Sequence, residues 1–191
     1  MNQTGHYGIN LTIGGTCLLA FVFLNRPISG AIAFVTIASV AQLPDIDHHA
    51  YNVPLIKHRG WTHTIYFATG LGVCAAVGGA LFTQYFASFT PITSPLFFPP
   101  NYVGGLILIF STSVTVGILG HLAGDMITPA GIAPFNPVLP RSPITALPTN
   151  SWSLNLTTAA NPTANILLGL LGAAITAVAF YITIPEVIAT V

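Results

Sequence analysis

Five long apolar stretches, none of which contains Asp, Glu, Lys or Arg, constrain the fold of this chain most strongly. A helix needs roughly 17 to 25 predominantly apolar residues to cross a bilayer. The stretches are Tyr7–Leu24, Ile28–Leu43, Thr64–Phe82, Val103–Gly120 and Ala164–Ile184. They predict an all-α, polytopic membrane protein of about five transmembrane helices, formed by residues 1–191 as a single domain.

The composition agrees with lipid as the main solvent of the chain. Charged residues make up 4% of its 191 residues, whereas a soluble domain has about 25%. The hydrophobic fraction of 53% excludes intrinsic disorder, which needs few apolar residues and high charge. The net charge is zero with only four basic residues, so we expect no nucleic-acid partner.

The ionisable residues gather on one side of the predicted bundle. With five spans, the N-terminus, the loop 44–61 and the loop 122–163 share one side of the membrane. Of the six His, four acidic and four basic residues, only Arg26 and Glu186 fall on the opposite side. This distribution predicts one polar site at one membrane interface. Three of the four Lys and Arg residues lie there, which favours a site facing the cytoplasm.

The first polar motif follows the second apolar stretch and contains Asp45, Asp47 and His48. Two carboxylates beside an imidazole offer oxygen and nitrogen ligands, which suit zinc, manganese or iron. The alternative is a helix-ending turn in which an Asp caps the helix and the His faces lipid headgroups. The adjacent His49 is the weaker candidate.

The second motif, Lys57–Thr64, contains His58 and His63. Residues five apart do not share a helix face, so we expect Thr62 to cap the third helix and His63 to open it. The planar guanidinium of Arg59 suits phosphate or carboxylate. The alternative is an interfacial loop that contacts lipid phosphates.

The third motif pairs His121 with Asp125, which share a helix face at i, i+4 spacing. Both side chains could bind one metal, or Asp125 could orient His121. The alternative is a simple helix-end ion pair.

His6, near the start of the chain, is a further candidate. A lone His near a chain end is generally solvated, but His6 is included as a metal ligand because it falls on the same side of the membrane as the three motifs.

The motifs together resemble those of the YdjM-like family, inner-membrane proteins described as predicted metal-dependent hydrolases. The segments that carry the resemblance are Leu43–His48, His58–Thr64, His121–Gly131, the pair Gly5-His6 and Pro140–Pro143. The family is distantly grouped with zinc-dependent phospholipase C and single-strand nucleases, which implies phosphoester chemistry. The fifth apolar stretch carries no motif of the family. By motif position, the resemblance implies a ligand role for Asp45, Asp47, His48, His58, His63, His121 and Asp125.

We therefore expect an inner-membrane hydrolase that uses one to two divalent metal ions, zinc first, to cleave a lipid or small-molecule phosphoester. Asp45 or Asp47 would bridge the metals, and Asp125 would take or relay a proton. Cationic side chains would clamp the phosphate charge; these are Arg59, Lys57 and Arg141.

Two non-enzymatic readings stay open at this point. A metal or proton transporter would need charged groups near the bilayer midplane, whereas the apolar stretches here are free of charge. A structural protein would use a closed shell of metal ligands to hold its loops together.

Overall fold

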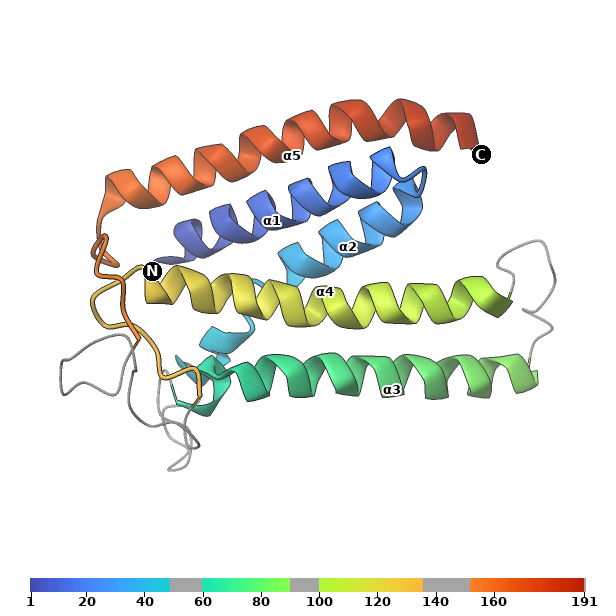
Figure 1. Ribbon diagram of the computed structural model, residues 1–191, viewed down its shortest axis with the longest axis horizontal. Helices are drawn as coiled ribbons and strands as arrows, with labels where there is room; N and C mark the ends of the chain where they lie inside the picture. The colour runs from blue at the N-terminus through green and yellow to red at the C-terminus, as the bar shows by residue number, and fades with distance from the viewer. Residues whose placement is uncertain (49–59, 90–99, 136–151, 191) are drawn as a thin grey trace.

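The protein, described by a computed structural model over residues 1–48, 60–89, 100–135 and 152–190, is a bundle of long helices (Figure 1). The helices are α1 (Gln3–Phe23), α2 (Pro27–Ser39), α3 (Ile65–Phe89), α4 (Pro100–Met126) and α5 (Pro162–Thr190). In the described part of the connection between α2 and α3 lie two short 3-10 turns, η1 (Pro44–His48) and η2 (Trp61–His63). Within these described ranges, five segments are long and apolar enough to cross a membrane, which confirms the predicted class and number of spans.

The N-terminal helix starts earlier than its apolar stretch. Asn2 caps α1, because its side-chain oxygen accepts a hydrogen bond of 3.0 Å from the backbone N–H of Gly5. As a result, His6 lies inside the first turns of a helix and its side chain is buried instead of solvated.

The bundle is held together by close helix contacts and one polar tie. α1 lies between α5 and α2, and α4 contacts both α2 and α3 (Figure 1). Gly8 and Gly172 let α1 and α5 approach closely, since a Cβ at either position would lie 2.4 Å from backbone of the other helix. The side-chain nitrogen of Asn10 donates to the carbonyls of Ile37 (3.0 Å) and Gly117 (2.9 Å), which joins α1 to α2 and α4.

The outer helices present apolar side chains to their surroundings. Val73, Val77 and Leu81 are exposed along one face of α3, and Leu167 and Leu170 are exposed on α5. Because water disfavours continuous apolar faces of this size, these surfaces are the ones that contact lipid.

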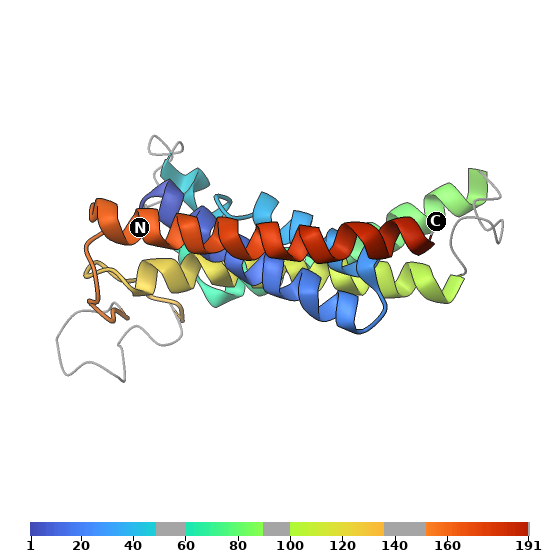
Figure 2. The same cartoon turned by 90° about the horizontal axis from the view of Figure 1, so that it is seen from above.

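The polar motifs meet at one end of the bundle. The chain's N-terminus, η1, η2 and the C-terminal end of α4 lie at that end, and the C-terminus lies at the other (Figures 1 and 2). α4 extends past its predicted end at Gly120 to Met126, so its last turns carry His121 and Asp125. This arrangement confirms that His and Asp residues distant in sequence gather at one end.

Candidate metal centre

Histidines and carboxylates from four elements converge at the N-terminal end of the bundle. The elements contribute His6 from α1, Asp45 and Asp47 from η1, His63 from η2, and His121 and Asp125 from α4. Their side chains are at most 2% exposed, apart from that of Asp45, which is 24% exposed. Carboxylates buried this close to one another need a neighbouring positive charge or a bound cation to be stable.

Two imidazole nitrogens face two carboxylate oxygens. His63 Nε2 lies 3.5 Å from Asp45 Oδ1 and 3.3 Å from Asp125 Oδ2. His121 Nε2 lies 3.5 and 3.6 Å from the same two oxygens. Charge-assisted hydrogen bonds are about 2.7–2.9 Å long, so these separations are too long for strong ones. A tetrahedral zinc site with bonds of about 2.0–2.2 Å has neighbouring donors about 3.3–3.6 Å apart. The four separations between imidazole and carboxylate atoms thus fall in the range found between neighbouring ligands of one ion.

The ring of His121 is oriented by a backbone carbonyl. Its Nδ1 lies 2.7 Å from the carbonyl oxygen of Ala41 and donates to it. In the neutral ring this leaves Nε2 with the free lone pair. Nε2 is buried and makes no hydrogen bond among the described residues. An imidazole nitrogen in that state fits a metal ligand.

The ring of His63 is oriented by a side-chain pair. The hydroxyl of Thr62 donates to Asp47 Oδ2 at 2.6 Å, and its oxygen lies 3.0 Å from His63 Nδ1. Since the single hydroxyl proton is already donated, the oxygen accepts from the Nδ1–H of His63. Asp47 Oδ2 also lies 3.4 Å from that nitrogen. Together these contacts direct the Nε2 lone pair of His63 toward Asp45 and Asp125.

The two oxygens of Asp125 have different partners. Oδ2 faces His63 and His121, whereas Oδ1 accepts a 2.7 Å hydrogen bond from the amino group of Met1. Oδ1 also lies 3.5 Å from His6 Nε2. The amino group and the imidazoles therefore surround this buried carboxylate with positive or polar groups.

The carboxylates also control the titration of His63. Burial would lower the pKa of its ring, but the facing carboxylates of Asp125 and Asp45 act in the opposite direction and prevail. The pKa of His63 therefore lies above its ordinary value, and a cation entering the centre competes with the ring proton.

Two overlapping groups of side chains could hold an ion. One group is His6, Asp45 and His121, and the other is His63, His121 and Asp125. His121 belongs to both, but its single free nitrogen lone pair binds one ion. The two groups therefore cannot each bind a separate ion through His121.

The predicted site residues fall into three sets. Asp45, His63, His121 and Asp125 lie together, with His6 and Asp47 in contact with them. The backbone of His48 belongs to η1, and its side chain is outside the described part. The candidates that lie outside the described residues are His49, Lys57, His58, Arg59 and Arg141.

The expected cap of the third helix was wrong by two residues. α3 begins at Ile65, and Thr64 caps it, because the Thr64 oxygen accepts a 3.1 Å hydrogen bond from the backbone N–H of Phe67. Thr62 instead binds Asp47, and His63 lies in η2 ahead of the helix. The sequence singled out Thr62 only as a helix cap and did not indicate its contact with Asp47. The backbone carbonyl of Ala41 has no side-chain signal at all.

The fold and the site define a multi-pass helical membrane protein with a buried His/Asp cluster capable of holding a metal. The family model of the YdjM inner membrane protein matches residues 1–187. The chain therefore belongs to the YdjM inner membrane protein family. The match includes α5, which carries none of the polar motifs. Comparisons with curated proteins and with solved structures find no significant match.

Proposed function

We propose that this protein is a membrane-bound metal-dependent hydrolase that cleaves a phosphoester, from a lipid or a lipid-linked phosphate. The main support is a set of four donor atoms, namely the Nε2 atoms of His63 and His121 and one carboxylate oxygen each of Asp45 and Asp125. Each Nε2 lies 3.3–3.6 Å from both oxygens, a spacing that suits ligands of one ion. A divalent ion held there would supply Lewis acidity and lower the pKa of a coordinated water from about 16 toward about 7.

Zinc is the ion that this donor set favours. Two imidazole nitrogens and two carboxylate oxygens without a thiolate suit zinc and its neighbours in the first transition series. The proposal of zinc therefore rests on the types of donor atom that the described candidate residues offer.

The chain's own residues would divide the work of hydrolysis. Asp45 is the partly exposed donor, so water and substrate would reach the centre from its side. Asp125 would take up a proton and pass it to His6, whose Nε2 lies 3.5 Å from Asp125 Oδ1. Both groups are buried, which limits exchange of that proton with bulk water.

Cationic residues would stabilise the charge that develops on the phosphate. Arg59 is the leading candidate, since a guanidinium binds two phosphate oxygens through parallel hydrogen bonds. Lys57 and Arg141 would assist it. All three assignments rest on the sequence and the family motifs.

A metal or proton transporter is less well supported. Such a protein needs ionisable groups along a path through the bilayer. Among the described residues, the histidines and carboxylates that contact one another lie at one end of the bundle. That position favours chemistry at an interface over transport.

Hydrolysis and orientation can each be tested directly. Purified protein should release the alcohol from a phosphoester lipid with zinc present, and a chelator should abolish the release. A rate of alcohol release that equals the rate in buffer alone and does not change with zinc would refute the proposed hydrolase activity.

We place the site in the cytoplasm, so a reporter fused after Val191 should be active outside it. A reporter active only in the cytoplasm would contradict that orientation.

A further inference from the structure

Asn10 is a buried asparagine of α1 that joins two other helices close to the metal centre. Its side chain is fully buried, and its Nδ2 donates to the carbonyls of Ile37 on α2 (3.0 Å) and Gly117 on α4 (2.9 Å). A side-chain amide nitrogen carries two protons, so these two hydrogen bonds use both of them. The Asn10 side chain therefore ties α2 to α4 at a fixed separation.

The two carbonyls that Asn10 binds lie one helical turn before a second contact between the same segments. Gly117 lies four residues before His121, and Ile37 lies four residues before Ala41. In that second contact, His121 Nδ1 donates to the carbonyl of Ala41 at 2.7 Å. The bridge through Asn10 is thus the neighbour of the hydrogen bond that orients a proposed metal ligand.

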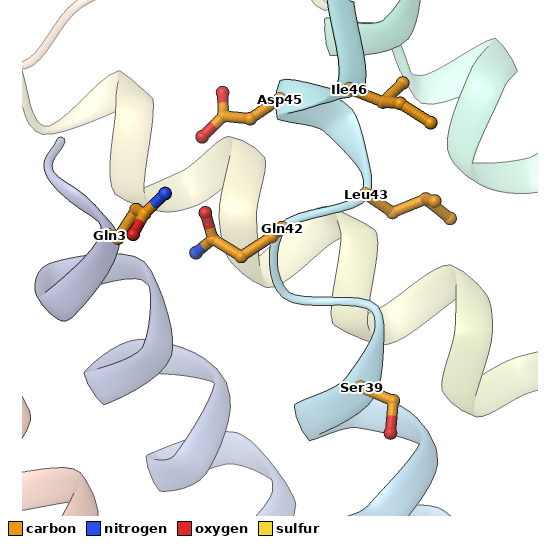
Figure 3. Close-up of a pocket in the computed structure, with 6 residues that line it drawn as sticks. All are labelled: Gln3, Ser39, Gln42, Leu43, Asp45 and Ile46. Atoms are coloured by element: carbon orange, nitrogen blue, oxygen red, sulfur yellow. The ribbon is translucent and has the colours of Figure 1, made fainter. Parts of the chain in front are cut away.

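The end of α2 depends on partners from other helices. α2 ends at Ser39, and the chain then passes through a turn into η1 (Figure 3). The N–H of Ala41 donates to the carbonyl of Ala38 at 3.4 Å, whereas in a continuing helix it would donate to that of Ile37. A helix leaves its last carbonyls without helical partners. Side chains of α1 and α4 bind the carbonyls of Ile37 and Ala41, and they determine where this stretch of chain lies.

Two glycines of α4 give the bridge its space. A Cβ at Gly120 would lie 2.6 Å from Asn10 Oδ1, and a Cβ at Gly117 would lie 3.0 Å from the carbonyl oxygen of Ile37. A larger residue at either position would push the amide or the end of α2 away from α4. The close approach of α2 and α4 and the Asn10 bridge therefore depend on each other.

We propose that Asn10 is a positioning residue of the metal centre, which sets the separation between the end of α2 and α4 and so presents the Ala41 carbonyl to His121. The inference rests on the proposed function, because His121 acts there as a metal ligand. While Nδ1–H is held on that carbonyl, the Nε2 lone pair stays available to a metal. An asparagine that only fastened the helices would affect stability on substitution and leave the His121 hydrogen bond unchanged.

The experiment follows the Nδ1 proton of His121 and needs neither metal nor turnover. Full-length protein in detergent is labelled with ¹⁵N-histidine, and the signal is assigned by its absence from His121→Gln. A ring proton in a buried hydrogen bond exchanges slowly with water and is observed by NMR, whereas a free one exchanges too fast. Asn10→Leu, similar in size but without a donor, should lose this signal in metal-free protein. It should also bind zinc about tenfold more weakly.

Asn165→Leu is the matched control. Asn165 is also buried and also donates two hydrogen bonds to carbonyls, those of Ala159 (3.0 Å) and Asn161 (2.7 Å). Like Asn10, it has a buried Oδ1 without a hydrogen bond among the described residues. Both of its acceptors lie just before α5, in a segment that carries no proposed ligand. Its substitution should leave the His121 signal and the zinc affinity unchanged.

A second variant keeps the shape of the side chain. In Asn10→Asp a carboxyl can donate at most one hydrogen bond, so the signal and the zinc affinity should lie between those of the wild type and Asn10→Leu. If Asn10→Leu does not fold, Asn10→Asp decides the question, and an unchanged His121 signal in it would overturn the proposal.

The remaining outcomes separate this proposal from the proposed function. An unchanged His121 signal in folded Asn10→Leu would overturn the positioning role, as would an equal loss of signal in Asn165→Leu. If the signal depends on Asn10 but the wild-type protein neither binds zinc nor cleaves an ester, the role of Asn10 in positioning His121 stands and the proposed function fails.

Discussion

The imidazole ring of His6 is stacked on that of His121, with ring centroids 3.7 Å apart and planes within 9° of parallel. The contact joins the first turns of α1 to the last turns of α4. His121 is held from one direction by the carbonyl of Ala41 and from the other by this ring. His6 therefore fixes the plane of a proposed metal ligand, in addition to its own contact with Asp125.

Replacement of His6 should weaken metal binding. We expect His6→Ala to lower zinc affinity by about 10- to 100-fold, the usual effect of losing a residue that orients a ligand. Zinc affinity is measured by competition with a chelating dye. His49→Ala is the control, because His49 is the weaker candidate of the first motif and should affect zinc affinity far less. Equal affinities in the two variants would show that His6 contributes nothing to the centre.

Thr62 and Thr64 provide a matched pair with different roles. Thr62→Val removes the hydroxyl between Asp47 and His63, so zinc affinity should fall by roughly tenfold or more. Thr64→Val removes the cap of α3 and should cost about 1 kcal/mol of stability with little change in affinity. Thermal unfolding and dye competition on both variants separate the two effects. The same affinity loss in both variants would refute the orienting role of Thr62.

Much of this arrangement could be predicted from the sequence, and particular residues show which features could not. Charge-free apolar stretches predicted the five spans, because lipid leaves little choice of structure for them. The spacing of His121 and Asp125 predicted that they share a helix face. Burial of His6 was not visible, since it depends on Asn2 starting α1 before its apolar stretch.

The raised pKa of His63 predicts a pH dependence of the metal-free protein. A protonated His63 stabilises the fold beside Asp45 and Asp125, so this stabilisation is complete below the ordinary histidine pKa of about 6.5. It is lost as the pH rises through the raised pKa in the folded state. The unfolding temperature of metal-free protein should therefore fall across that range, and His63→Gln should flatten the curve.

Zinc should reverse this trend. Metal binding needs the neutral ring, so zinc affinity should rise with pH over the same interval. Metal-loaded and metal-free samples are compared at each pH by thermal unfolding. An unfolding temperature of the metal-free wild type that stays constant or rises through the interval would contradict the assignment to His63.

A substitution at Arg59 tests whether this residue binds phosphate or only contacts the lipid surface. If its guanidinium stabilises charge that develops during hydrolysis, Arg59→Lys should reduce turnover on the order of 10²-fold. Zinc content should stay normal, because arginine is not a metal ligand. Turnover and zinc content are measured on the same preparation. Nearly normal turnover would show that Arg59 only contacts headgroups.

The metal-to-protein ratio of purified, unchelated protein tests the metal centre most directly. Elemental analysis should find about one zinc ion per chain, bound by donors from η1, η2 and α4. His63→Ala should lose the ion and be less stable, because it leaves buried carboxylates uncompensated. Less than about 0.2 equivalents of any transition metal, with no recovery when metal is added back, would contradict a metal centre at these residues.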